Sequence, residues 1–175
     1  MHILFFEDKP TRFAGGQERS LFEMAERYHK QGVSVSLCYK EEGDFLPDYK
    51  KFCKHTFKLE SRQIRLNQLL NHLKDLSLLK KLDKQFHFTD FYANQYFDIP
   101  FVTLASIVLN KKSTCHLRLP APPYLSRQYR FFLEKTGKLI AISKHTKKTY
   151  LEMGVTNSNF EVVYNIINKP SFIPE

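Results

Sequence analysis

Hydrophobic residues along the chain form short runs that alternate with longer segments of helical period. Residues 2–7 are a nearly continuous apolar run, which is typical of a strand covered on both faces. The next segment has apolar residues on one helical face, and Gly32 follows it as a stop signal. A loop that contains Gly43 and Pro47 comes after the second strand. Further strands are predicted at 33–39, 56–59, 86–89, 113–119, 138–142 and 160–167, and further helices at 66–82, 100–109, 125–135 and 144–153.

Alternating strands and helices predict an α/β fold, with a Rossmann-like parallel sheet that is covered by helices on both faces. Right-handed crossovers place the carboxyl ends of all strands along one edge, where ligands of such folds bind. A chain of 175 residues can bury one proper core, so we predict a single domain over residues 1–175. The segments expected to carry the site follow the strands directly: 8–18, 41–45, 89–92, 116–120, 143–146 and 165–168.

The chain has a net charge of +9, from 27 Lys and Arg residues against 18 Asp and Glu residues. This excess indicates an anionic partner, which could be nucleic acid, acidic lipid headgroups or phosphorylated small molecules; the alternative is a solvated basic surface. Nucleic acid is the weakest of the three, because the positive residues are spread over several segments without an arginine–aromatic signature. We therefore expect no nucleic-acid partner.

Two classes of protein are disfavoured by the sequence. No apolar run approaches the ~20 residues needed to cross a bilayer, and the first residues lack the features of a secretory signal, so we expect a cytoplasmic protein. The three cysteines lack a Cys-x-x-Cys pairing, and no metal-ligand motif is present, so we expect neither a disulfide framework nor a bound metal.

A double glycine, Gly15-Gly16, stands between the first predicted strand and the first predicted helix. Glycines at such a junction let backbone N–H groups approach an anion at the positive end of the helix, which makes this a candidate phosphate site. The alternative is a loop that only needs a positive φ angle. The spacing is not Gly-x-Gly-x-x-Gly and no Gly-Lys-Ser/Thr follows, so a dinucleotide fingerprint and a P-loop are both disfavoured.

Several segments together resemble family-4 glycosyltransferases with the GT-B fold. Residues 14–18, Ala-Gly-Gly-Gln-Glu, resemble the Gly-Gly-x-Glu element that follows the N-terminal strand of that family. Residues 139–147 resemble its I-A-x-S-x-x-T strand–helix segment, and residues 161–165 resemble the strand that closes its N-terminal domain. Residues 115–120, Cys-His-Leu-Arg-Leu-Pro, are similar to a post-strand histidine motif of some members. The resemblance extends over essentially the whole chain.

This resemblance implies an enzyme that moves a sugar, of hexosyl type, from a nucleotide-sugar donor to a hydroxyl acceptor. The configuration would be retained, no metal or other cofactor would be needed, and the acceptor would be a saccharide or a lipid-linked saccharide. The chain would be the N-terminal, acceptor-side domain, while the C-terminal domain that grips the nucleotide is absent from it. We therefore expect the chain alone to be inactive, as an excised domain or as half of a split enzyme.

The same resemblance assigns roles to individual residues. Gly15 and Gly16 would approach the donor diphosphate, where preorganised backbone donors stabilise a leaving group. His116 would hydrogen-bond the transferred sugar; the alternative is a histidine that satisfies a neighbouring backbone group. Apart from the resemblance, the fork geometry of an arginine would let Arg118 pair with a phosphate or an acceptor carboxylate, and the alternative is a surface ion pair.

Four further residues are candidates for acceptor binding or for the domain junction. Glu18 is either structural, as a carboxylate in the first turn of a helix, or orients the acceptor. Ser143 is most simply a helix N-cap, and Lys144 next to it is a candidate anion contact. Asn165 matches the domain-junction position of the family, although Ile166 stands where the family has glycine.

The leucine-rich segment 66–82 allows two interpretations. Leucines at this period usually pack on the sheet. Together with the lysines of the segment and with Arg62 and Arg65, they would instead form a basic amphipathic surface close to anionic lipid, at the inner face of a membrane. The alternative function is accordingly a non-catalytic basic module that docks on a partner protein or on an anionic membrane.

Overall fold

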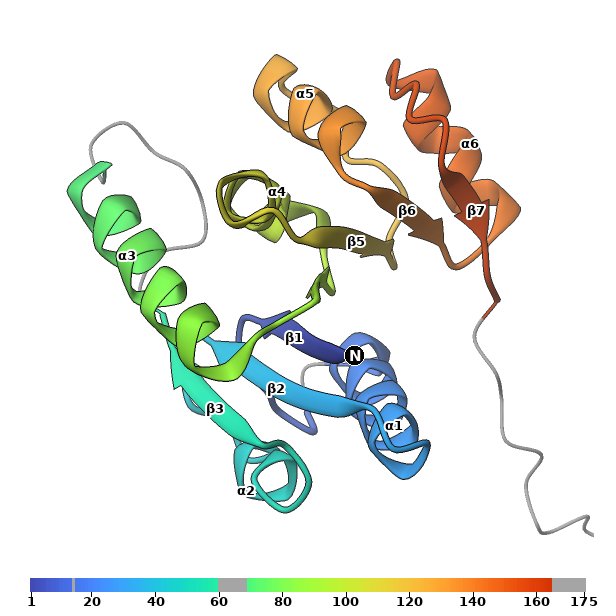
Figure 1. Ribbon diagram of the computed structural model, residues 1–175. Coiled ribbons are helices and arrows are strands. Elements are labelled where there is room, and N and C mark those ends of the chain that lie inside the picture. Colours follow the sequence, from blue (N-terminus) through green and yellow to red (C-terminus); the bar gives the residue numbers. More distant parts are fainter. Residues whose placement is uncertain (14, 60–68, 165–175) are drawn as a thin grey trace, which may run out of the picture.

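The computed structural model describes residues 1–13, 15–59 and 69–164, and within them seven strands form one parallel sheet (Figure 1). The strand order is β3-β2-β1-β4-β5-β6-β7, which confirms the predicted Rossmann-like fold class. The strands are β1 (His2–Glu7), β2 (Ser34–Tyr39), β3 (His55–Lys58), β4 (Asp90–Ala93), β5 (Lys112–Leu117), β6 (Lys138–Ala141) and β7 (Phe160–Val162). The helices are α1 (Gly16–Lys30), α2 (Leu46–Tyr49), α3 (Leu69–Phe86), the short 3-10 helix η2 (Tyr96–Asp98), α4 (Ile99–Leu109), α5 (Arg127–Lys135) and α6 (Lys144–Glu152).

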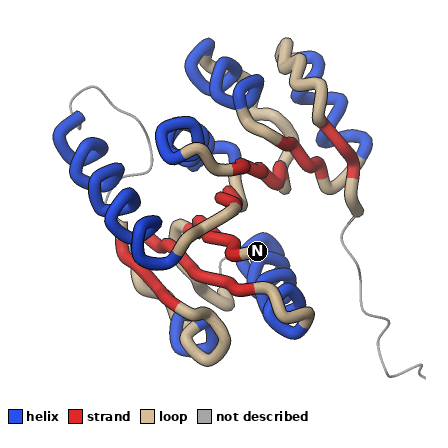
Figure 2. The backbone as a smooth tube through the Cα atoms, in the orientation of Figure 1, coloured by secondary structure: helices blue, strands red, loops and turns tan. Residues whose placement is uncertain are grey.

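The sheet has helices on both faces, as Figures 1 and 2 show. Alternate residues of β1 point to opposite sides, because successive side chains of a strand do so. Phe5 belongs to the core cluster beneath α1 and α2, together with Leu21 of α1. Leu4 and Phe6 belong to the larger cluster on the other face, to which α3, α4, α5 and α6 contribute. Burial on both faces explains why β1 reads as a continuous apolar run.

The direction in which strands are added reverses at β1. From β1 the chain adds β2 and then β3 on one side, and α3 carries it back so that β4 pairs with the other side of β1. Strands β5, β6 and β7 then continue outward from β4. The carboxyl ends of β1 and β4 therefore meet at a topological switch point, where open α/β sheets form their binding crevice.

The predicted strand at 86–89 is wrong, because the strand in this part of the chain begins four residues later. Helix α3 continues to Phe86, whose ring packs against Phe57 of β3, and β4 begins only at Asp90, opposite Ile3. His87 ends the helix because its φ of 54° lies in the left-handed region. Phe88 is buried in the turn between α3 and β4. The apolar residues that suggested a strand at 86–89 are therefore explained by burial in this turn and in the last turn of α3.

Two other boundaries differ from the sequence prediction. The expected loop after β2 contains the short helix α2, which begins with Leu46 and Pro47 and buries Leu46 and Tyr49. The last strand is shorter than the predicted 160–167, because β7 ends at Val162; residues 165–167 lie outside the described residues. The start of the predicted helix 66–82 and Arg62 and Arg65 also lie outside them.

Candidate functional site

Three polar side chains meet where β1, β4 and β5 end. Glu7 is the last residue of β1, Asn94 directly follows β4, and Arg118 directly follows β5. All three are buried, with 4%, 1% and 4% of their surface exposed. The Asn94 amide donates to Glu7 Oε2 over 2.8 Å, and Arg118 Nε donates to Asn94 Oδ1 over 2.6 Å. Because charged groups are costly to bury without partners, these hydrogen bonds through Asn94 contribute to holding a carboxylate and a guanidinium together here.

The first turn of α1 is tied to the same cluster. Arg118 Nη1 donates to Ser20 Oγ over 2.7 Å, and Asn94 Nδ2 donates to the Gln17 carbonyl over 3.4 Å. Gly15, the N-cap of α1, has a φ of 134°, and both Gly15 and Gly16 are exposed. A Cβ atom added at Gly16 would meet no atom within 4 Å. The positive end of α1 is therefore exposed at the double glycine, and Arg118 is tied to the same helix through Ser20.

Glu18 lies in the first turn of the same helix and is half-buried. Its Oε2 atom is buried and has no hydrogen-bond partner within the described parts of the chain. That oxygen lies 3.9 Å from the position of a Cβ added at Gly15. Glu18 therefore has the dipole-stabilising placement that the sequence predicted, and it borders the double glycine directly.

His116 lies two residues before Arg118, at the end of β5, and only 6% of it is exposed. Its Nδ1 atom is 2.7 Å from the hydroxyl of Tyr92, on the neighbouring strand β4. Its Nε2 atom is buried and makes no hydrogen bond to any residue that the structure describes. The alternative that His116 only satisfies a backbone group is thus not what the geometry shows.

Burial dominates the electrostatics of this group. It lowers the pKa of His116 to about 3, and the positive charge of Arg118 lowers it further in the same direction. Burial also raises the pKa of Tyr92, so that its hydroxyl stays protonated. Burial lowers the pKa of Arg118, but a guanidinium remains charged at any physiological pH. The site therefore combines one fixed cation with a neutral imidazole.

His116 and Arg118 line a pocket of about 140 Å³ at the carboxyl edge of the sheet. Its other lining residues come from α1 and from the segment after β7: Ser20, Glu23, Met24, Arg27, Val163 and Tyr164. The structure thus brings the two predicted catalytic residues together, next to the helix that begins with the double glycine.

The remaining predicted residues lie elsewhere along this edge. Ser143 caps α6, because its Oγ accepts a hydrogen bond from the Thr146 backbone N–H over 3.0 Å, as the simplest prediction had it. Lys144 is exposed in the first turn of α6 and does not line the pocket described above. Asn165 and Ala14 lie outside the described residues.

Sequence reasoning missed Glu7, Asn94 and Tyr92. Because the strand was predicted four residues too early, the segment expected to carry the site was 89–92, which is mostly strand β4 itself and ends before Asn94. Tyr92 lies within that segment, but no pattern in the sequence singled it out. The signal that could have located the site is the polar pair Asn94-Gln95 directly after the apolar run Phe91–Ala93. Glu7 is the last residue of the first strand, as the sequence predicted. Only its hydrogen bond with Asn94 shows that it belongs to the candidate site.

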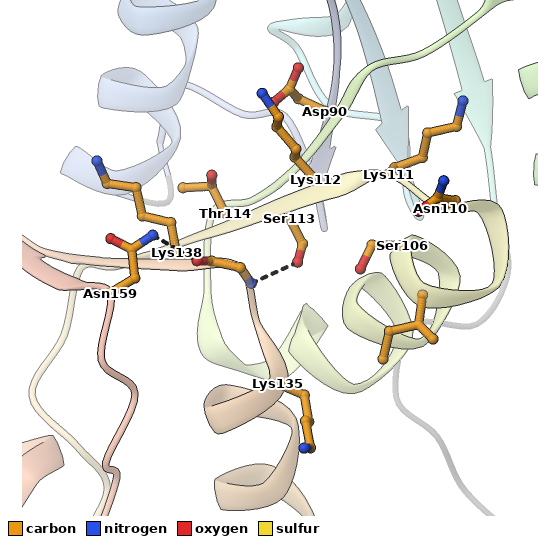
Figure 3. Close-up of a pocket in the computed structure, with 12 residues that line it drawn as sticks. Asp90, Ser106, Asn110, Lys111, Lys112, Ser113, Thr114, Lys135, Lys138 and Asn159 are labelled. Carbon is orange, nitrogen blue, oxygen red and sulfur yellow. Dashed lines mark hydrogen bonds between the residues drawn. The ribbon is translucent and has the colours of Figure 1, made fainter.

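A larger pocket of about 590 Å³ lies at the opposite, amino edge of the sheet (Figure 3). Four lysines line it, but Figure 3 shows their side chains pointing in different directions. Lys111 pairs with Asp83 over 2.8 Å, and Lys138 pairs with Glu161 over 2.8 Å. The pocket also lies at the carboxyl ends of α4 and α5, which disfavour anions. We therefore place the candidate site at the carboxyl edge.

Two properties concern the described residues as a whole. Among residues 1–13, 15–59 and 69–164, no three His, Cys, Asp or Glu side chains are grouped so that they could hold a metal ion. None of the helices in these ranges has the length and apolar character needed to cross a membrane.

The strand order, with its switch point beside the polar cluster, defines a Rossmann-like domain. The chain belongs to glycosyltransferase family 4, because the sequence model of that family matches residues 14–169. No curated protein matches the chain at the level required for a relative.

Solved structures of glycosyltransferases share the fold. Anabaena HepE in complex with UDP-glucose is 20% identical, with a TM-score of 0.70, and the match covers 98% of this chain and 47% of HepE. A glycosyltransferase from Rickettsia africae is 14% identical, with a TM-score of 0.70 and coverage of 93% and 42%. The lipopolysaccharide outer core galactosyltransferase WaaB is 16% identical, with a TM-score of 0.67 and coverage of 99% and 48%. The chain thus spans about half the length of the structures that it matches.

Proposed function

We propose that the chain is the N-terminal, acceptor-side domain of an enzyme that transfers a hexosyl group from a nucleotide-sugar to a hydroxyl acceptor, with retained configuration. The observation that carries this proposal is the pocket lined by His116 and Arg118, together with the hydrogen bond that ties Arg118 to Ser20 of α1. Membership in glycosyltransferase family 4 supports it, as does the fold shared with HepE, which was solved with UDP-glucose.

In the proposed reaction, the bond between the sugar C1 atom and a diphosphate oxygen breaks, and a bond between C1 and the acceptor oxygen forms. The acceptor proton passes to an oxygen of the departing diphosphate. The N–H groups of Gly15 and Gly16, at the positive end of α1, stabilise the negative charge that develops on that diphosphate. Because these donors are already in place, they need no reorganisation during the reaction.

Arg118 and His116 have different tasks in this proposal. The Arg118 guanidinium adds a fixed positive charge next to α1, held by its hydrogen bonds to Asn94 and Ser20. The imidazole of His116 contacts the transferred sugar and orients it. We propose that these groups act without a resident metal ion, since the helix N-terminus and Arg118 supply the positive charge for the leaving group. Residues 1–175 by themselves would show little transfer, because they span only about half the length of the glycosyltransferase structures that they match.

The test supplies the chain together with a donor-binding domain and measures nucleotide release from a panel of UDP-, GDP- and ADP-sugars. His116→Ala is expected to lower kcat on the order of 10²-fold, as removal of a preorganised donor does. Gly16→Ala is expected to fold normally, because its Cβ meets no protein atom, and to weaken donor binding. Lys112→Ala, in the pocket at the opposite edge, is the matched control. Unchanged transfer by His116→Ala would remove this residue from the site.

A second candidate function, docking on an anionic membrane, is favoured by the outer face of α3. Leu70 and Leu73 are exposed there, beside four exposed lysines: Lys74, Lys80, Lys81 and Lys84. The two acidic residues within α3 do not offset them, since Asp75 is buried and Asp83 pairs with Lys111. Basic residues next to exposed apolar ones are the pattern of helices that lie on lipid headgroups. Such docking is compatible with transfer to a lipid-linked acceptor.

A further inference from the structure

We propose that Tyr92 fixes His116 in the tautomer with hydrogen on Nε2, so that the ring presents a hydrogen-bond donor to a ligand oxygen in the pocket. In this role Tyr92 is a positioning residue, which acts through His116. The identity of the ligand oxygen, a hydroxyl of the transferred sugar, rests on the function proposed above. The tautomer itself rests only on the arrangement of the two side chains.

The hydrogen bond between the two residues determines where the protons lie. The Tyr92 hydroxyl is buried and lies 2.7 Å from His116 Nδ1, which is its hydrogen-bond partner among the described residues. A phenol has a single O–H to donate, and a buried donor without an acceptor costs about 1–3 kcal/mol. If Nδ1 carried the hydrogen, both the phenolic hydrogen and the Nε2 lone pair would lack a partner among the described residues, whereas donation by Tyr92 leaves only Nε2–H without one. The hydroxyl therefore donates, and Nδ1 accepts.

The other ring nitrogen then carries the proton, because a neutral imidazole has one donor and one acceptor. His116 Nε2 is buried and makes no hydrogen bond within the described ranges, and His116 is one of the residues that line the pocket. A buried donor of this kind calls for a partner, and none of the described residues supplies one. An oxygen with lone pairs, such as a sugar hydroxyl, fits this donor, whereas an ammonium group does not.

The surroundings keep the ring neutral. The charged Arg118 lies two residues along the same strand end, and the neutral Tyr92 donates from β4. Glu23 and Arg27 of α1 line the pocket with charges of opposite sign. Tyr164, which follows β7, lines it as well and carries a hydroxyl group. Burial and Arg118 both disfavour an imidazolium, so both act in the same direction as the hydrogen bond.

One consequence concerns the chemistry of the site. With Nδ1 occupied by Tyr92 and Nε2 already protonated, His116 has no lone pair available in the pocket. It can orient and polarise the sugar by donating, but it cannot remove the acceptor proton as a general base. This agrees with a reaction in which that proton leaves with the diphosphate.

The experiment uses the ¹⁵N-labelled chain without any substrate. Long-range ¹H–¹⁵N correlation spectra distinguish a protonated from an unprotonated ring nitrogen, and His116→Gln identifies the signals of His116. We expect the Nε2–H form throughout pH 5–8. In Tyr92→Phe, Nδ1 loses its donor, and we expect a mixture of both tautomers. Tyr150→Phe is the matched control, because this buried tyrosine has an unpartnered hydroxyl among the described residues and lies in the core cluster on the other face.

Three outcomes would overturn the inference: the Nδ1–H form in the unmodified chain, an imidazolium at pH 7, or a tautomer ratio that Tyr92→Phe leaves unchanged. The first two need no variant, so a failure of Tyr92→Phe to fold does not affect them. With a donor-binding domain supplied, Tyr92→Phe is expected to lower kcat about tenfold, whereas Tyr150→Phe is expected to change neither the tautomer nor the rate. Failure of the transferase proposal would leave the spectrum as expected, and the two results are thus separable.

Discussion

Asn94 joins groups of opposite charge at the centre of the candidate site. Its amide donates to the carboxylate of Glu7 and accepts from the guanidinium of Arg118, and all three side chains are nearly inaccessible. An amide suits this position because it carries both a donor and an acceptor in a fixed plane. Neither a carboxylate nor an ammonium could serve both neighbours. The orientation of Arg118 toward α1 therefore depends on a residue that has no direct role in the proposed reaction.

His116 makes stability depend on pH in a defined window. Its pKa is lowered from 6.5 to about 3 on folding, so the unfolded chain binds more protons than the folded chain between these values. The stabilising contribution is complete above pH 6.5 and is lost as the pH falls toward 3. Between pH 7.5 and pH 5, we expect this residue to account for a loss of about 2 kcal/mol in the free energy of unfolding.

Urea unfolding of the chain and of His116→Gln at both pH values measures this contribution. The unmodified chain should lose about 2 kcal/mol more than the variant on acidification. His2, whose pKa burial also lowers, is present in both proteins and cancels in the comparison. Equal losses would mean that His116 is accessible to protons in the folded state.

At the scale of elements, the junction between α3 and β4 decides which residues reach the site. Helix α3 ends at Phe86, His87 reverses the chain with a left-handed φ, and β4 begins at Asp90. This register places Asn94 beyond the strand end, level with Glu7 of β1. A strand at 86–89 would have brought residues of β4 into that position instead. The amphipathic pattern alone could not distinguish the two, because the turn also buries an apolar residue, Phe88.

Glycine substitutions on either side of the helix end test this boundary. His87→Gly should raise the free energy of unfolding by about 0.5 kcal/mol, because glycine tolerates a positive φ that other residues adopt at a cost. Gln85→Gly, inside the last turn of α3, should lower it by about 1 kcal/mol. Both side chains are exposed, so packing does not enter the comparison. Equal effects of the two substitutions in chemical denaturation would contradict the helix end at Phe86.

At the scale of the whole molecule, the excess positive charge is not distributed evenly around the site. The larger lysine-lined pocket at the amino edge has ion pairs to Asp83 and Glu161, whereas the outer face of α3 has four exposed lysines. In Figure 1, α3 lies on the opposite side of the sheet from α1, which leaves it accessible while the carboxyl edge is occupied. Part of the net charge of +9 therefore lies on α3, a helix that has no part in the proposed reaction.

Vesicle sedimentation tests whether this face binds lipid. The chain should bind vesicles that contain anionic lipid at low salt and be released at high salt, since screening weakens the attraction. Replacing Lys74, Lys80, Lys81 and Lys84 by Gln should weaken binding more than about tenfold. A control with the same loss of charge replaces four exposed lysines outside α3: Lys9, Lys40, Lys50 and Lys148. Equal weakening in both variants would show that net charge, and not α3, is responsible.

The sequence by itself determined the alternation of strands and helices, the parallel sheet, the edge that carries the site and the position of the double glycine. These follow from local periodicity and turn chemistry, which act between residues close in the chain. Only the tertiary structure decided that Glu7 meets Asn94, 87 residues away, and that Tyr92 meets His116, 24 residues away. Those contacts depend on which strands are neighbours and in which register they pair. The sequences of buried parallel strands are similar apolar runs, so they do not reveal either the neighbours or the register.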